Sequence, residues 1–236
     1  YLIENLKDKE IAQLIRKQLY RLITKKPLPL KTQTPIASPE ATKDLKKAIE
    51  QCELLGETSD GMKIYLYQYS GSSPIFRELG RLREIAFRAV GEGSGKRRDI
   101  DKYGMDYQHL VLWDAKQLEL VGAYRLACAK DIIEKHGQKG LYTDSLFSYS
   151  DEMAPYFAQG IELGRSFVQP KYWGRKSLDY LWFGIGAFVN RYPQYRYLFG
   201  AVSVSNALPE QAKSLLVHYY QHYYGAQQTL AIPNNE

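Results

Sequence analysis

One segment of the sequence, residues 161–178, constrains the fold and the chemistry of this chain more than any other. It reads Ile-Glu-Leu-Gly-Arg-Ser-Phe-Val-Gln-Pro-Lys-Tyr-Trp-Gly-Arg-Lys-Ser-Leu. A buried strand is expected first, then a basic turn, and then the start of a strongly apolar helix. The N-terminus of a helix and neighbouring cations both attract phosphate groups. The segment therefore predicts a strand–turn–helix unit that holds a phosphate-bearing group.

Hydrophobic periodicity predicts strands and helices over most of the chain. Strands are expected at 62–69, 109–113, 119–127, 160–168 and 197–204, and helices at 1–25, 38–56, 74–90, 178–191 and 209–224. Ser38 and Pro39 favour the start of the second helix. A tight turn makes the second and third strands antiparallel, whereas the helix between the last two favours a parallel pair. The expected fold class is α/β, a mixed central sheet with helices on both faces.

The length and composition allow one well-buried core and an appendage. The chain has 236 residues, of which 44% are hydrophobic. Because a proline-rich stretch follows the first helix and residue 1 is not Met, residues 1–37 are expected to be a helical tail and linker from an upstream region. The domain proper is expected at 38–236. The longest apolar run, residues 181–189, is far shorter than the roughly 20 residues of a membrane span.

Charge and metal-binding residue types narrow the classes of partner. A net charge of +6 favours an anionic partner, either nucleic acid, an acidic protein or an anionic lipid surface, or simply marks a basic soluble protein. Cys52 and Cys128 are too few for a disulfide framework, are expected to be buried, and fit a reducing compartment. His218 and His222 share a helical face but lack a third ligand, so no metal site is expected.

Several motifs occur together between Phe87 and residue 185. They are Asp101 and Asp106 in a polar loop, His-Leu-Val-Leu-Trp-Asp at 109–114, Val-Gly-Ala-Tyr-Arg-Leu at 121–126, Glu-Leu-Gly-Arg-Ser at 162–166, and Leu-Trp-Phe-Gly-Ile at 181–185. The combination resembles the GNAT-fold N-acyltransferases, which include acyl-homoserine-lactone synthases and ornithine-lipid (aminolipid) N-acyltransferases, often labelled hemolysin-like. The resemblance covers roughly residues 40–230 and is closer to the aminolipid branch.

This resemblance implies both the fold and the reaction. The expected enzyme moves a long or 3-hydroxy fatty acyl group from acyl carrier protein, or from acyl-CoA, to the amine of an amino acid such as ornithine, which gives a lyso-aminolipid. Family members continue into further strands, so the domain is expected to be truncated at its C-terminal end. Residues 1–35 resemble the end of a lysophospholipid acyltransferase domain found in fused family members. A cytoplasmic location, peripheral at the inner membrane, is implied.

The candidate catalytic residues are Glu162, Arg165 and Ser166. Residues three apart on a regular strand face opposite sides, but the resemblance implies a bulge that brings Glu162 and Arg165 to one face. Glu162 is then a general base or orients the substrate; alternatively, it forms a structural salt bridge with Arg165. Backbone N–H groups near Ser166 and Phe167 would stabilise the oxyanion. No histidine relay accompanies Ser166, so a covalent role is not expected.

The candidate donor-binding residues follow in the same segment. They are Phe167, Lys171, Gly174, Arg175 and Lys176. GNAT enzymes that use coenzyme A have a glycine-rich turn here, whereas only Gly174 remains in this chain. This difference favours a single phosphopantetheine phosphate, and the cations suit docking of an acidic carrier protein. The alternative is a solvated basic turn without a function.

The candidate acceptor-binding residues form a second group. They are Arg83, Phe87, Asp101, Asp106 and Arg125. An amino acid carries a carboxylate and an ammonium, so its pocket needs a guanidinium and carboxylates. Arg125 ends an interior strand and must have a partner, either structural or substrate. Asp101 and Asp106 are alternatively solvated loop residues.

The sequence leaves alternatives for the position of several aromatic residues and for the function. Trp173, Tyr180 and Trp182 are expected in the core or along an acyl groove, and the tyrosine-rich helix at 209–224 suits packing or a membrane interface. An acyl-homoserine-lactone-type synthase is disfavoured by the absence of tryptophan between Phe87 and Asp101. A non-catalytic hemolysin-like membrane protein is the rival from another class. Nucleic-acid binding is disfavoured because the aromatics fall on predicted buried elements.

Overall fold

The chain divides into two compact units, Tyr1–Pro35 and Ile36–Glu236. The computed structural model describes residues 6–26, 29, 33–204 and 208–234. The first unit contains α1 (Asp8–Ile23), whose first turn is capped by a hydrogen bond from the Lys7 N–H to the Glu10 carboxylate at 2.9 Å. Apolar side chains of α1 such as Ile15, Leu19 and Ile23 are exposed. The helix predicted at 1–25 is confirmed for this range.

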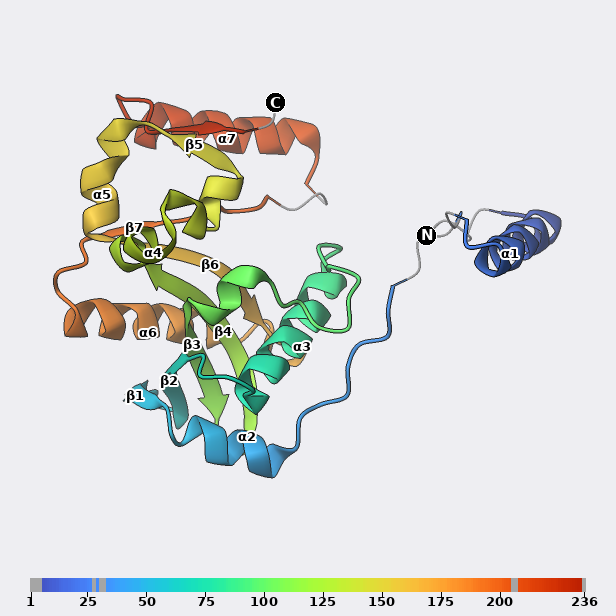
Figure 1. Cartoon of the computed structure of the whole chain (residues 1–236), viewed down its shortest axis with the longest axis horizontal. Helices are drawn as coiled ribbons and strands as arrows, with labels where there is room; N and C mark the ends of the chain where they lie inside the picture. Colours follow the sequence, from blue (N-terminus) through green and yellow to red (C-terminus); the bar gives the residue numbers. More distant parts are fainter. Residues whose placement is uncertain (1–5, 27–28, 30–32, 205–207, 235–236) are drawn as a thin grey trace. The chain divides into compact units, whose positions relative to one another are not determined.

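The second unit is built on a six-stranded mixed sheet with the order β1-β2-β3-β4-β6-β7 (Figure 1). The strands are β1 (Glu53–Glu57), β2 (Met62–Gln68), β3 (Gln108–Asp114), β4 (Glu119–Cys128), β6 (Gly160–Val168) and β7 (Tyr197–Phe199). All neighbours are antiparallel except β6 and β7, which are parallel. The antiparallel hairpin and the parallel pair predicted from the connections are therefore confirmed.

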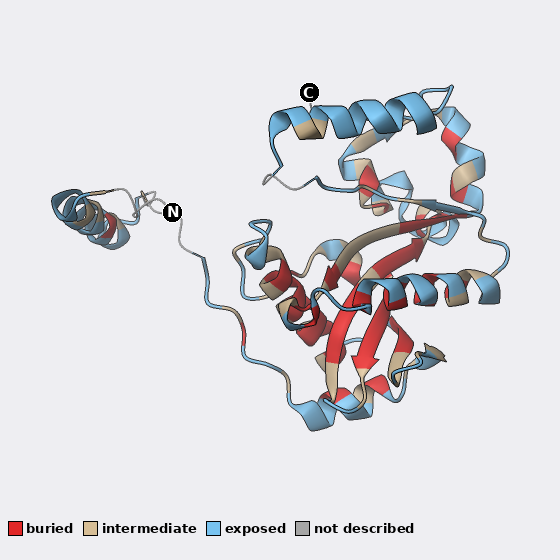
Figure 2. Cartoon of the chain, turned by 180° about the vertical axis from the view of Figure 1, so that it is seen from behind, coloured by how far each residue is buried: buried red, intermediate tan, exposed pale blue. Residues whose placement is uncertain are grey.

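Helices cover both faces of this sheet, as predicted. Side chains alternate along β3, so Val111 and Trp113 pack toward α2 (Thr42–Ile49) and α3 (Pro74–Ala89), whereas Leu110 and Leu112 pack toward α6 (Ser177–Arg191). Figure 2 shows the buried residues gathered in the central strands and on the helix faces turned toward them. This rigid sheet positions the site described below.

A third hydrophobic cluster is formed mainly by the segment that connects β4 to β6 along the chain. It contains α4 (Ala129–His136), α5 (Ala154–Ala158) and β5 (Phe147–Tyr149), and β5 pairs with β8 (Ala231–Pro233) near the end of the chain. Short 3-10 helices occur at η1 (Lys102–Met105), η2 (Gln138–Gly140), η3 (Thr143–Ser145), η4 (Asp151–Met153) and η5 (Pro170–Tyr172). No strand was predicted between the strands at 119–127 and 160–168, so the β5–β8 pair is an addition to the prediction.

The helix predicted at 38–56 is wrong at both ends. α2 begins after Ala41, and the chain before it stays extended. The reason is Glu40, whose carboxylate receives hydrogen bonds from Arg77 at 2.7 Å and Arg98 at 3.0 Å. After α2 the chain enters β1, because residues 53–57 complete the edge of the sheet beside β2.

The strand predicted at 197–204 is confirmed only for Tyr197–Phe199. At Gly200 the two backbones come so close that an added Cβ would lie 2.2 Å from the carbonyl oxygen of Leu163. β6 keeps its pairing with β4 as far as Gly164 and bulges after it, and the parallel ladder with β7 ends at Glu162 and Phe199.

Two helices are less buried than predicted. On α6, Leu178, Trp182 and Phe183 are exposed while Leu181 and Ile185 pack on the sheet. α7 (Glu210–Tyr224) has no buried residue over its described length. Its tyrosine-rich face is therefore exposed. The packing of this face, one of the two alternatives expected from the sequence, does not occur among the described residues.

Gly184 and Gly186 on α6 offer a matched test of this packing. A Cβ at Gly184 would lie 2.8 Å from atoms of Ile64 and Leu110, and overpacking a core costs about 1–3 kcal/mol. A Cβ at Gly186 would meet no atom within 4 Å, and alanine there gains about 1 kcal/mol of helix propensity. We expect Gly184→Ala to lower the free energy of unfolding in urea and Gly186→Ala to raise it. Equal effects would contradict the close packing of α6 on β2 and β3.

Candidate active site

The site begins at a bulge in β6. Ala123 of β4 pairs with Phe167, and Arg125 pairs with Gly164, so β6 has one more residue than β4 over this stretch. The extra residue leaves Arg165 with a φ of 49°, a left-handed conformation that is uncommon for residues with a side chain. The bulge expected in this strand is therefore confirmed. A bulge interrupts the ladder and leaves backbone groups without a strand partner.

A large cavity opens where β6 and β7 separate. Glu162 and Phe199 are the last register pair of the two strands, and the cavity beyond them has a volume of about 840 Å³. Arg165, Ser166 and Glu92 contribute polar groups to its lining, while most other lining side chains are aromatic or aliphatic. A volume of this size and a mostly apolar wall are typical of small-molecule sites.

A smaller cavity lies between the bulge and the first turn of α6. It measures about 390 Å³, and Ser166, Gly174, Arg175 and Ser177 are among its lining residues. Ser177 is only 1% exposed, and its hydroxyl has no hydrogen-bond partner in the described structure. Ser166 lines both cavities, so each of them reaches the bulge.

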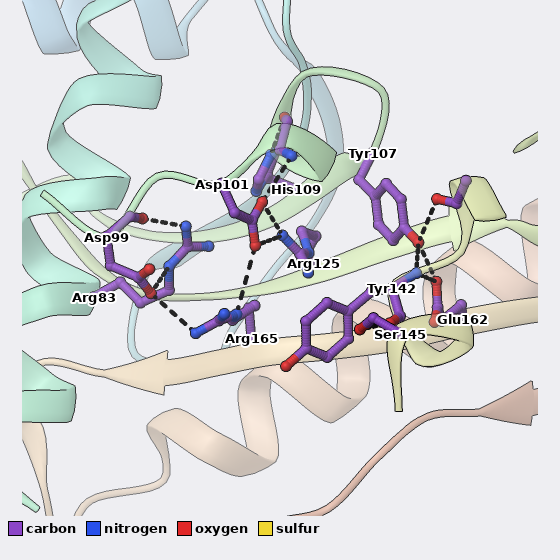
Figure 3. A network of polar contacts seen from close by, with 12 residues as sticks. Arg83, Asp99, Asp101, Tyr107, His109, Arg125, Tyr142, Ser145, Glu162 and Arg165 are labelled. Atoms are coloured by element: carbon purple, nitrogen blue, oxygen red, sulfur yellow. Dashed lines mark hydrogen bonds and ion pairs between the residues drawn. The ribbon is translucent and has the colours of Figure 1, made fainter. Parts of the chain in front are cut away.

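Three arginines and two aspartates form a network beside the bulge (Figure 3). Arg83 Nε donates to Asp99 Oδ2 at 2.8 Å, and Arg165 Nη1 lies 3.3 Å from the same oxygen. Arg125 Nη1 donates to Asp101 at 2.7 Å, and Arg165 Nε lies 3.7 Å from that carboxylate. Arg165 therefore joins the two ion pairs. Three guanidiniums against two carboxylates leave one positive charge in excess.

Aromatic rings enclose two of these guanidiniums. The Tyr142 ring centre lies 5.3 Å from Cζ of Arg125 and 5.4 Å from Cζ of Arg165, and the Tyr107 ring centre lies 4.9 Å from Cζ of Arg125. Nε and Nη2 of Arg125 and Nε of Arg165 have no hydrogen-bond partner in the part of the chain described. The ring faces supply cation–π attraction in place of some of these bonds.

The charges in this network also fix the protonation of Asp101. Burial by itself would raise the pKa of Asp101, but the charge of Arg125, its hydrogen bond, and the charges of Arg83 and Arg165 outweigh burial and lower it. Asp101 is therefore ionised at neutral pH and keeps Arg165 oriented.

Glu162 belongs to a separate buried cluster. Its carboxylate accepts hydrogen bonds from the Tyr107 hydroxyl, the Tyr142 N–H at 3.1 Å and the Thr143 N–H at 2.6 Å. Burial, reinforced by the charge of Glu162, raises the pKa of Tyr107, so the phenol stays protonated and donates. The salt bridge between Glu162 and Arg165 that the sequence left open does not form. Glu162 instead anchors the backbone that carries the Tyr142 ring.

The predicted acceptor residues are brought together with one exception. Arg83, Asp101 and Arg125 share the network, and Phe87 contacts Arg165, with its ring centre 5.9 Å from Cζ. Asp106 lies outside this group, because it receives hydrogen bonds from Lys135 and His136.

Sequence reasoning missed Asp99, Tyr107 and Tyr142. Asp99 stands two residues before Asp101 in the same loop, and this spacing is the signal that could have indicated it. Tyr107 and Tyr142 belong to segments without a recognisable motif. They acquire their position through Glu162, which lies far from both in the sequence.

Of the predicted donor residues, Phe167, Gly174 and Arg175 line the smaller cavity, whereas Lys171 and Lys176 do not. Lys171 is paired with Glu119, and Cζ of Arg175 lies 5.3 Å from the ring centre of Tyr172. Lys176 is the N-cap residue of α6. The Phe167 side chain is packed in the core, so only its backbone can face a ligand. Trp173 and Trp182 are half exposed and line one cavity each, whereas Tyr180 is in the core.

His109 packs in the sheet next to this network. One ring nitrogen lies 3.0 Å from the Gly104 carbonyl oxygen, and burial lowers the pKa of His109 to about 3. The unfolded chain has the ordinary value of about 6.5 and so binds an additional proton between these limits. The contribution of His109 to stability is therefore complete above pH 6.5 and declines as the pH falls toward 3.

We expect the free energy of unfolding to fall between pH 6.5 and 4.5, with His109 contributing up to about 1.4 kcal/mol per pH unit. His109→Gln should remove this part of the slope in urea unfolding at several pH values. His218→Gln on the exposed helix α7 is the matched control and should leave the slope unchanged. An unaltered slope in His109→Gln would contradict a neutral buried imidazole.

The described residues contain no group of three or more His, Cys, Asp or Glu side chains that could hold a metal ion. No described helix is long and apolar enough to cross a membrane.

Comparisons with known proteins agree with this fold. The family profile described as acetyltransferase (GNAT) domain matches residues 82–183. A glycine N(alpha)-acyltransferase of Phocaeicola vulgatus is 32% identical over 211 residues, which is 84% of this chain and 65% of that protein. The corresponding protein of Bacteroides thetaiotaomicron is 32% identical over 206 residues, 81% of this chain and 61% of its own length.

A more distant relative is the L-ornithine N(alpha)-acyltransferase of Rhizobium meliloti, 29% identical over 146 residues, 58% of this chain and 48% of that protein. The chain thus spans less than two thirds of the length of each of these three relatives. The matched segment 82–183 runs from α3 through the bulge into α6. It includes Arg83, Ser166, which lines both cavities, and the first turns of α6. The chain contains a GNAT acetyltransferase domain and has the GNAT fold.

Proposed function

We propose that this chain is an N-acyltransferase that moves a fatty acyl group from a thioester to the amine of an amino acid. The observation that carries the proposal is that two cavities both reach Ser166, on a bulge that frees backbone groups. A thioester bound there has its carbonyl next to the bulge. Preorganised N–H donors at such a point stabilise the oxyanion, and one donor contributes on the order of 3 kcal/mol.

Once the thioester and the amine are positioned, the reaction requires only proton transfers in addition to the attack of the amine. The acceptor ammonium first loses a proton, and its nitrogen then forms a bond to the thioester carbon. The carbon–sulfur bond of the tetrahedral intermediate breaks, and the second proton of the amine moves to the leaving sulfur. The products are an amide and a free thiol, so no covalent enzyme intermediate is required.

For the donor, we propose the phosphopantetheine arm of an acyl carrier protein in the smaller cavity. The N-terminus of α6, the unpartnered Ser177 hydroxyl and Arg175 suit a single phosphate. Lys171 is engaged with Glu119, so Arg175 and Lys176 are the cations that remain for a carrier protein. An acyl-CoA donor uses the same phosphate site and is the comparison in the assay below.

For the acceptor, we propose that the amino-acid carboxylate binds at Arg165. This side chain lines the large cavity and is 26% exposed although Asp99 and Asp101 hold its guanidinium. The excess positive charge of the network suits one carboxylate. Relatives of this chain are named for glycine and for ornithine as acceptors, so these two amines are the first to test.

For proton transfer, we assign different roles to two glutamates. Glu162 is fully engaged by three donors and buried, so we assign it the positioning of Tyr142 over Arg125 and Arg165. Glu92 lines the large cavity, is exposed and accepts a hydrogen bond from Ser203 Oγ at 3.3 Å. A carboxylate in this position can accept the proton of the incoming ammonium.

We further propose that the protein works at the cytoplasmic surface of the inner membrane, because its product is a lipid. α1 combines basic residues with exposed Ile15, Leu19 and Ile23, and α7 exposes several tyrosines. Both compositions suit the interface of an anionic membrane.

The proposal is tested by direct transfer. The protein is incubated with acyl carrier protein that bears a labelled acyl chain, and separately with labelled acyl-CoA, together with glycine, ornithine or other amino acids. We expect label in an amide-linked product, with the carrier-protein donor more efficient. Absence of transfer to every amine by the folded protein would overturn the proposal.

The two glutamates are separated by activity and stability measured together. We expect Glu92→Gln to reduce kcat/KM by at least about a hundredfold and to leave the melting temperature unchanged, because this carboxylate is exposed. Glu162→Gln should lower both kcat/KM and the melting temperature, because an amide NH₂ would face backbone donors. A roughly hundredfold loss of kcat/KM in Glu162→Gln with an unchanged melting temperature would make Glu162 the proton acceptor instead.

A further inference from the structure

Part of the large cavity's wall comes from the small sheet formed by β5 and β8. Leu146, Phe147 and Pro233 line the cavity. Phe147 and Pro233 are register partners of the β5–β8 pair. Segments far apart in the sequence are thus joined into one apolar wall. We call this wall, Leu146, Phe147 and Pro233, the ribbon wall.

The ribbon wall is anchored to the domain. Asn234 donates from its backbone N–H to the Leu146 carbonyl at 2.9 Å and from Nδ2 to the Asp144 carbonyl at 3.0 Å. The Ser150 N–H donates to the Leu230 carbonyl at 3.1 Å, and Leu230 packs against the cluster that contains Phe157. These bonds on both sides of the ladder hold the wall in place beside the cavity.

Only one face of the ribbon meets the cavity. The neighbouring register pair is Ser148 and Ile232, and neither residue lines the cavity. Ile232 is 59% exposed. Successive residues of a strand point to opposite faces, which accounts for the difference. Ile232 is therefore a control that shares the strand but not the wall.

We propose that the ribbon wall limits the length of the acyl chain that the enzyme accepts. The inference rests on the proposed function. If the phosphopantetheine arm occupies the smaller cavity and the thioester lies at Ser166, the acyl chain extends into the large cavity. Arg165 and Glu92 make one region of that cavity polar, so the chain follows the apolar lining, of which the ribbon wall is a part.

The test uses the full chain and a series of acyl carrier proteins that differ only in acyl length. Phe147→Ala opens the wall and should shift the kcat/KM optimum to longer chains, whereas Phe147→Trp should shift it to shorter ones. A single methylene changes discrimination about tenfold or more in a closed apolar pocket. We therefore expect the ratio of long to short substrates to rise at least about tenfold in Phe147→Ala. Ile232→Ala should leave the ratio unchanged.

A binding measurement separates this proposal from the proposed function. Acyl-pantetheine amides of graded chain length cannot transfer their acyl group, and their binding is followed by the fluorescence of Trp182 in the cavity lining. We expect affinity to rise with length to a limit that Phe147→Ala extends, whether or not transfer occurs. The same length profile in wild type and Phe147→Ala, or an equal shift in Ile232→Ala, would overturn the ribbon wall as the determinant.

Discussion

The site depends on one constraint, the bulge in β6 that turns Arg165 into a left-handed conformation. A side chain in this region of φ costs on the order of 1–2 kcal/mol and persists only when its surroundings fix it. Asp99 and Asp101 provide that fixation, because each holds the same guanidinium. Around this residue β6 changes from a buried part, Gly160–Glu162, to a part from Leu163 onward that lines the two cavities.

The buried charges depend on the same residue, Arg165. Arg83 and Arg125 are almost fully buried, and a buried guanidinium is tolerated only with partners. Their carboxylates are shared with Arg165, and Tyr107 and Tyr142 cover the remaining faces of Arg125. Glu162 in turn fixes the backbone at Tyr142. Polar groups that look separate in the sequence thus form two clusters in contact through the rings of Tyr107 and Tyr142.

The sequence predicted the parts of the fold that depend on local pattern. The alternation in β2, β3, β4 and β6 and the apolar spacing in α3 and α6 identified these elements within a few residues. The errors occur where tertiary contacts override local signals, as at Glu40 and at Gly200. For the site, Arg83, Asp101 and Arg125 were grouped correctly. The role of Glu162 was not visible, because its partners are backbone N–H groups from a distant segment without a motif.

The part of the cavity wall that β5 and β8 form differs from the central sheet in how its strands are connected. The sheet core forms from strands that are mostly sequence neighbours, but the ladder between β5 and β8 joins residues far apart along the chain. Long-range pairings of this kind carry a large loop-closure entropy and form slowly. In the described sheets this ladder spans the longest stretch of chain, so the loop-closure entropy counts against the cavity wall more than against any strand pair of the central sheet. Loss of this one pairing would open the cavity and leave the six-stranded sheet in place.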